Sequence, residues 1–291
     1  MQRKKKLLGK ATVKTQSAME YLMTYGWAIL IIAVVLAALF ELGIFNPMTF
    51  APKASPGSCQ VVRPEGAGTI NFMSLEGECN GELPQYVADF NSTTYIVAPA
   101  PYGGGSSPIT FTIWVKEPSV NFGDFVENYR PGSQVLILRD QGNGDDAFTL
   151  CSNNGNGCAY TLLFTAPHYN NWNFIVGDYN GITLTAYVNG GFRGSYGVSN
   201  IPIDTYNSIG MGSQGFVGSI ANVQIYNTSL SQPEIQALYQ EGIGGAPIDL
   251  QNLVGWWPLN GNANDYSGNG NNGVPSNVVF TNNWYSGYST P

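Results

Sequence analysis

WNFIVGDYNGITLTAYVNG, residues Trp172–Gly190, is the stretch that decides the fold. It holds two short runs of residues that favour β-strands, Asn173–Gly177 and Ile182–Val188. The dipeptide Asn180-Gly181 separates these runs, and Asn189-Gly190 follows the second one. Asn-Gly pairs are strong hairpin signals because both residues tolerate a positive φ. The stretch therefore predicts neighbouring antiparallel strands.

Three further runs of the same character extend this prediction to a large β domain: Ile109–Val115 (ITFTIWV), Gln134–Arg139 (QVLILR) and Gly218–Tyr226 (GSIANVQIY). The 36 Gly, 17 Tyr and 14 Phe suit short strands joined by many turns. Capping-box residues at Ser231–Glu234 open one short helix, which we expect to end before Gly242. The fold class expected is mainly β, an antiparallel jelly-roll β-sandwich.

The quoted stretch resembles the laminin-G-like, concanavalin A-like jelly-roll domains. Other matching segments are FTIWVK (Phe111–Lys116), SIGMGSQGFVGSIANVQIYN (Ser208–Asn227), SLSQPEIQALYQ (Ser229–Gln240) and LVGWWPLNGNANDYSGNGNNG (Leu253–Gly273). In that family the last motif opens the domain, whereas here it follows the closing helix. The resemblance implies a circularly permuted jelly roll whose family-first strand lies within residues 250–285. Two alternatives stay open, the truncated start of a second copy and strand exchange with a neighbouring subunit.

The N-terminus carries a separate signal. Residues 1–15 contain six basic residues and no acidic one, and Tyr21–Phe40 is uncharged. A secretory signal peptide has an apolar region of about 7–15 residues followed by a small-residue cleavage site. Twenty helical residues span roughly 30 Å, the thickness of a hydrocarbon core. We therefore expect a hydrophobic helix inserted in the cytoplasmic membrane, with its amino terminus inside.

Gln16, Glu20 and this apolar run resemble the archaeal type IV prepilins with class III signal peptides. The resemblance implies cleavage between Thr15 and Gln16 by a prepilin peptidase. It also implies that Glu20 pairs with the new amino terminus of a neighbouring subunit, since a carboxylate in an apolar helix needs a partner. One departure is that Ser17 stands directly after Gln16, one position earlier than in the family. The alternative is a single-pass anchor that never polymerises.

Together these features predict five segments. Residues 1–15 form a basic leader, 16–46 a pilin-type helix, 47–57 a linker, 58–84 a disulfide-tied β subregion and 85–291 the jelly roll. The expected function is that of a structural subunit in an archaeal surface filament displaying an adhesive, glycan-binding head. Its partners would be identical or related pilin subunits, prepilin peptidase, the membrane and glycans. The alternative is a membrane-anchored surface lectin.

The cysteines suit an extracytoplasmic location. Three pairings of the four are possible, and the two local ones, Cys59 with Cys79 and Cys151 with Cys158, are preferred. A zinc site is a poor alternative because the chain has one histidine, His168, and lacks a C-x-x-C spacing. The sequons at Asn91 and Asn227 are compatible with surface glycosylation.

Composition and motifs argue against other classes of function. All 19 acidic residues follow Thr15, so the body of the chain is acidic and a poor partner for nucleic acid. No nucleophile with a base, and no tight carboxylate cluster on one strand, is evident, so we expect no enzyme. Asp145 and Asp146 are adjacent, and a solvated turn is the preferred interpretation of the pair.

Two kinds of ligand remain. Calcium is the one cofactor suggested, with Asp265 and Asn269 as oxygen donors in a Gly-rich loop, although hydrogen-bonded Asx turns explain that loop at least as well. Glycan binding would need exposed aromatic rings, and the candidates in loops are Tyr102, Tyr169, Trp284, Tyr285 and Tyr288.

Overall fold

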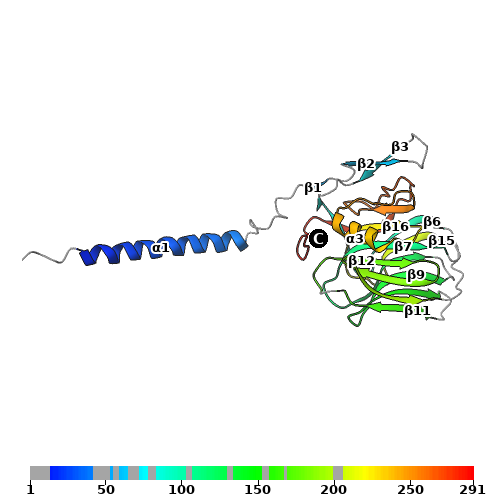
Figure 1. Ribbon diagram of the computed structural model, residues 1–291, viewed down its shortest axis with the longest axis horizontal. Coiled ribbons are helices and arrows are strands. Elements are labelled where there is room, and N and C mark those ends of the chain that lie inside the picture. Colours follow the sequence, from blue (N-terminus) through cyan, green and yellow to red (C-terminus); the bar gives the residue numbers. More distant parts are fainter. Residues whose placement is uncertain are drawn as a thin grey trace, which may run out of the picture. The chain divides into compact units, whose positions relative to one another are not determined.

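The structure is a computed structural model that describes residues 14–41, 53–54, 59–64, 72–77, 83–102, 107–129, 134–152, 157–166, 169–198 and 206–291. The chain divides into two units, Met1–Ala51 and Pro52–Pro291. The larger unit contains both sheets of a β-sandwich (Figure 1).

The first unit is a single helix, α1 (Lys14–Glu41). Its described apolar side chains are mostly exposed, with Met23 at 70% and Trp27 at 65%. The membrane-inserted helix expected over residues 21–40 is not supported, because the described residues contain no helix that is both long and apolar enough to cross a membrane. The backbone of Thr15, Gln16 and Glu20 is helical, and cleavage before Gln16 stays a prediction.

The second unit is built from two sheets. In the first the order is β11 (Gly157–Phe164), β10 (Asp146–Ser152), β9 (Gln134–Gln141), β8 (Phe122–Tyr129), β15 (Tyr206–Ser213), β6 (Tyr95–Tyr102) and β18 (Val274–Ser276). In the second it is β14 (Gly191–Gly197), β13 (Thr183–Val188), β12 (Asn173–Tyr179), β7 (Ile109–Lys116), β16 (Gly218–Tyr226), β5 (Val87–Phe90) and β19 (Val279–Thr281), with β17 (Leu253–Trp257) also paired to β16. Their described ladders are antiparallel.

The quoted stretch forms the pair β12 and β13, as predicted. Ile175 pairs with Val188, and the connecting turn is held by the Asn180 Oδ1, which accepts hydrogen bonds from the N–H groups of Ile182 and Thr183. Asn189 and Gly190 both have positive φ, at 52° and 74°. The antiparallel sandwich expected from the sequence is therefore confirmed.

The core lies between the two sheets and is rich in aromatic residues. Phe111 and Phe148 meet edge to face, with ring centroids 6.2 Å apart. Gly177 of β12 lies directly against the Phe148 ring, where a Cβ atom would come within 2.7 Å of Cδ2. Close packing of this kind leaves no room for a larger residue.

The C-terminal segment completes both sheets of its own chain. β17 pairs with β16, β18 with β6 and β19 with β5. Trp256 and Trp257 on β17 are both 0% exposed. These three strands pair with earlier strands of the same chain, and the circular permutation stays a prediction.

The remaining elements are short. β1 (Lys53–Ala54) pairs with β4 (Leu83–Pro84), and β2 (Cys59–Pro64) pairs with β3 (Phe72–Gly77). Helix α3 (Gln232–Glu241) begins and ends as predicted: the Glu234 carboxylate accepts the Ser231 N–H at 2.7 Å, and Gly242 follows with φ 81°.

The two cysteine pairs differ in what the structure describes. Cys151 and Cys158 are register partners in the ladder of β10 and β11. Cys59 begins β2, whereas Cys79 lies outside the described residues. Both disulfides stay predictions, and the register is compatible with the one on β10 and β11 because directly opposed residues bring their Cβ atoms close together.

Candidate functional site

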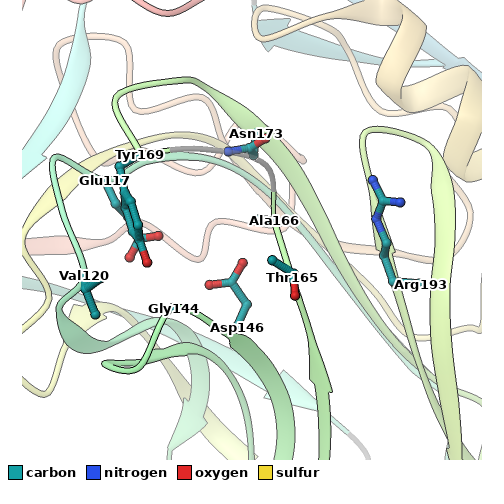
Figure 2. Close-up of a pocket in the computed structure, with 9 residues that line it drawn as sticks. All are labelled: Glu117, Val120, Gly144, Asp146, Thr165, Ala166, Tyr169, Asn173 and Arg193. Atoms are coloured by element: carbon teal, nitrogen blue, oxygen red, sulfur yellow. The ribbon is translucent and has the colours of Figure 1, made fainter.

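A cavity of about 670 Å³ opens where β7, β10, β11, β12 and β14 approach one another. We call it the acidic cavity, because two carboxyl groups form part of its wall. Figure 2 shows the Asp146 carboxylate pointing into it, on the side where Glu117 and Tyr169 lie. Its lining residues are Glu117, Val120, Gly144, Asp146, Thr165, Ala166, Tyr169, Asn173 and Arg193.

The tight connection between β9 and β10 positions the acids. Asp140 and Asp146 are directly opposite each other in this ladder, so their side chains share one face. Gly142 and Gly144 adopt positive φ (75° and 97°) in the turn, a conformation that favours glycine. The Asp140 carboxylate also orders the turn, since it accepts the N–H groups of Gly142 at 2.7 Å and Asn121 at 2.9 Å.

The two acids that line the cavity have fewer hydrogen-bond partners than Asp140. Glu117 Oε1 and Asp146 Oδ2 are buried and accept no hydrogen bond. Asp146 is only 5% exposed. A buried polar atom without a partner costs about 1–3 kcal/mol, and more when it is charged. These two oxygens therefore lower the stability of the folded protein.

The surroundings favour the neutral form of both acids. Burial, followed by the nearby charges of Asp146 and Asp140, raises the pKa of Glu117 to about 10. Burial, together with Asp140 and Asp145, raises the pKa of Asp146 well above its ordinary value. Glu117 therefore holds a proton at neutral pH and can donate it in a hydrogen bond to Asp140, and burial shifts Asp146 toward its neutral form.

The rest of the lining adds an aromatic ring and a cation. Tyr169 is 37% exposed, and Arg193 lies on the opposite wall in Figure 2. Carboxyl groups, an amide and an exposed aromatic ring are the groups with which proteins hold polar organic ligands in concave sites. The geometry is that of a binding site for a small polar molecule.

Comparison with known proteins identifies a family for the sandwich that contains this cavity. Residues 90–236 match the Laminin_G_3 family model, described as the concanavalin A-like lectin/glucanases superfamily. The chain belongs to this superfamily. Among curated proteins, none matches the chain.

Solved structures resemble this lectin-like chain in fold. A candidate carbohydrate-binding protein from Bacteroides ovatus ATCC 8483 is 16% identical, with a TM-score of 0.51 over 69% of this chain and 60% of that one. The heptameric SAP-like pentraxin of Limulus polyphemus is 10% identical, with a TM-score of 0.50 over 68% of this chain and 94% of that one. The chain thus spans about 60% of the Bacteroides protein's length.

A second cavity, of about 690 Å³, lies on the first sheet of this lectin-like sandwich. There Ser213 Oγ donates to Glu127 Oε1 at 2.7 Å, and Ser92–Val97 forms one wall. Nearby, Arg139 Nε donates to Asp124 Oδ1 at 2.6 Å. Burial raises the pKa of Asp124 to about 7 even though Arg139 opposes the shift.

The expected calcium donors have other partners in the superfamily fold. Asp265 Oδ1 accepts the N–H groups of Trp256 and Ser267, and its Oδ2 accepts the N–H of Asn271 at 2.8 Å. The side-chain amide of Asn269 donates to the carbonyl oxygen of Leu253 at 2.8 Å. Calcium at Asp265 and Asn269 stays a prediction, and this hydrogen bonding favours the Asx-turn interpretation.

The aromatic candidates fall into separate groups. Tyr169 lines the acidic cavity. Trp284 is 1% exposed and its carbonyl oxygen accepts the Trp172 Nε1–H, so it is a core residue and cannot stack on a ligand. The Tyr102 side chain and His168 lie outside the described residues. Both sequon residues, Asn91 and Asn227, are exposed, and their glycosylation stays a prediction.

Sequence reasoning missed the acids of the cavity. The solvated-turn interpretation is wrong for Asp146, which is buried, and fits the partly exposed Asp145 better. Nothing in the sequence indicated a site at Glu117, because this residue follows a strand and belongs to no recognisable motif. The clue that was present is DQGNGDD, a tight Gly-containing turn between acids, which brings Asp140 and Asp146 together.

Proposed function

We propose that this chain is a subunit of an archaeal type IV pilus-like surface filament whose lectin-like sandwich binds glycans. The observation that carries the glycan part is the acidic cavity, in which carboxyl groups face an exposed tyrosine ring within a sandwich of the lectin superfamily. Sugar hydroxyl groups both donate and accept hydrogen bonds, and protonated or ionised carboxyl groups can satisfy either role.

The assembly part of the proposal rests on α1 and the residues at its start. The exposed apolar side chains of this 28-residue helix favour burial against another apolar surface. Identical helices packed side by side in a filament core would provide that surface. Prepilin peptidase would cut between Thr15 and Gln16. Glu20 would then pair with the new amino terminus of a neighbouring subunit. The mature chain would pass from the cytoplasmic membrane to the cell surface.

The alternative function is a membrane-anchored surface lectin that does not polymerise. The two proposals share the glycan-binding domain and differ at the N-terminus. Neither calls for catalysis, and we propose a binding protein rather than an enzyme. We further propose that residues 250–285 represent the family's first strand in a circularly permuted domain.

The assembly proposal is tested by mass spectrometry of sheared extracellular filaments and of the membrane fraction. A mature peptide starting at Gln16 in the filaments is the expected result. Glu20→Ala should be processed but absent from filaments, whereas Glu41→Ala, at the other end of α1, should assemble normally. An intact Met1 leader found only in membranes would favour the anchored lectin and exclude the pilin role.

The glycan proposal is tested separately on a glycan array with the full-length chain in detergent. Retention on a defined set of glycans is expected. Tyr169→Ala should weaken that retention, and Tyr196→Ala on β14, an exposed tyrosine outside the acidic cavity, should leave it unchanged. No retention on any glycan would refute this part of the proposal.

A further inference from the structure

The unpartnered oxygens of the acidic cavity favour a ligand of a particular chemistry. Glu117 Oε1 and Asp146 Oδ2 lack hydrogen-bond partners, and Asp146 is buried and points into the cavity in Figure 2. A ligand group that donates hydrogen bonds and carries positive charge would supply the kind of partner that each of these oxygens lacks. Charge-assisted hydrogen bonds of this type are roughly twice as strong as neutral ones.

The charges around these two acids have a consistent sign. Asp140 and Asp145 flank them on the turn between β9 and β10, and Tyr169 faces the same acids. Arg193, the basic side chain of the lining, lies on the opposite wall in Figure 2. The wall that carries Glu117 and Asp146 therefore attracts cations, and the field is strengthened by the low dielectric of a partly enclosed site.

A metal ion fits this wall less well than an organic cation. In the part of the chain that the structure describes, no three Asp, Glu, His or Cys side chains are grouped closely enough to hold a metal ion. Calcium needs six to eight oxygen atoms at 2.3–2.6 Å around one point, as a general rule. A primary ammonium has three donors that point in different directions and so can reach carboxyl groups that do not share a centre.

The size and lining of the cavity identify the rest of the ligand. A cavity of about 670 Å³ accommodates more than an ammonium group alone. Tyr169, exposed at 37%, offers a ring face on which a sugar ring can stack. We propose that the acidic cavity binds amino sugars, with the ammonium group held by Glu117 and Asp146 and the sugar ring against Tyr169. This inference rests on the proposed glycan-binding function.

The protonation of the two acids in the free site predicts that protons are released when a cation binds. Burial raises the pKa of Glu117 to about 10 and that of Asp146 well above its ordinary value, and the nearby charge of Asp140 strengthens both effects. An ammonium group beside these acids favours their ionised forms, so binding must release protons. The number of protons released is measured by calorimetry in two buffers that differ in ionisation enthalpy.

The decisive experiment compares two probes that differ mainly in charge. Full-length chain in detergent is titrated with chitosan tetrasaccharide, which has free amines, and with chitin tetrasaccharide, in which these amines are acetylated. The free-amine probe is expected to bind about tenfold tighter or better and to release protons. Tetralysine, which has similar charge without sugar rings, should bind more weakly than the free-amine probe.

Two single-residue variants locate the effect. Asp146→Asn removes the ionisable group and keeps the size of a side chain whose neutral form is favoured by burial, so the variant should fold. It is expected to lose the preference for the free amine. Asp89→Asn is the control, because the Asp89 carboxylate is exposed on β5 and lies outside the cavity lining. That variant should keep the preference.

The outcomes separate this inference from the proposed function. Equal binding of both tetrasaccharides overturns the amino-sugar inference but leaves glycan binding intact. Tetralysine binding as tight as the free-amine probe also overturns it, because charge alone would then explain the affinity. Calcium binding that is lost in Asp146→Asn and competes with chitosan overturns it in favour of a metal site. If neither tetrasaccharide binds, the inference falls, and the glycan array decides the broader proposal.

Discussion

Replacing Glu117 with glutamine should stabilise the protein in a way that depends on pH. The folded-state pKa of Glu117 is about 10, whereas the ordinary value is 4.5. A carboxyl group with a raised folded-state pKa contributes stability below its unfolded pKa and loses that contribution as pH rises toward the folded pKa. Between pH 4.5 and pH 10 the wild-type side chain therefore destabilises the native state progressively.

At a pH where Glu117 is still protonated in the folded protein, its effect on the free energy of unfolding depends only on its ionisation in the unfolded chain. Each pH unit above 4.5 stabilises the unfolded chain by about 1.4 kcal/mol. Glutamine removes this contribution and keeps an N–H donor for Asp140. Glu117→Gln should therefore raise the free energy of unfolding by about 3 kcal/mol at pH 7 and by less than about 1 kcal/mol at pH 5.

Urea denaturation followed by tryptophan fluorescence measures this difference, because Trp114, Trp256 and Trp257 are buried in the native sandwich. The control is Asp89→Asn, which alters an exposed carboxylate on β5 and should change stability by no more than about 0.5 kcal/mol at either pH. A Glu117→Gln effect of equal size at pH 5 and pH 7 would refute the assignment of a raised pKa to this carboxyl group.

Three further predictions test packing and the C-terminal loop. Gly177→Ala should destabilise the sandwich by about 1–3 kcal/mol in urea denaturation, because the new Cβ would meet Phe148 at 2.7 Å, whereas Gly197→Ala, with nothing within 4 Å, should be nearly neutral. Asp265→Ala should lower the free energy of unfolding by about 3 kcal/mol, since three backbone N–H groups lose a charged acceptor, and an effect below about 1 kcal/mol would contradict this role. Chelation of calcium should leave the melting temperature unchanged, and a fall of several degrees would instead support metal ligation by Asp265 and Asn269.

The parts of the fold that depend on local sequence could be predicted. The β12–β13 pair, the Asn-Gly turns and helix α3 follow from residues within ten or so positions of one another, where strand propensity, positive φ and capping act directly. The partners of the C-terminal strands, β16, β6 and β5, were not predicted, because no local signal specifies which distant strand a segment will join.

The acidic cavity could not be predicted for a related reason. Glu117 directly follows β7 of one sheet and Asp146 begins β10 of the other, so the two approach only when the two sheets pack together. Adjacent acids in a Gly-rich turn usually lie in solvent, and the burial of Asp146 arises from the strands packed around it. The exposure of Tyr169 and the burial of Trp284 likewise depend on tertiary packing that aromatic residue type does not reveal.

The pairing of β17, β18 and β19 with much earlier strands also dictates when the domain can fold. The Tyr86 N–H donates to Asn260 Oδ1 across 174 positions of sequence, and Trp284 Nε1 donates to the Pro84 carbonyl oxygen across 200. Contacts of such long range must wait for synthesis of the whole segment and make folding slow. Until β17, β18 and β19 have been made, β5, β6 and part of β16 are therefore open strand edges, and this period is when the protein is most exposed to aggregation and most in need of a chaperone.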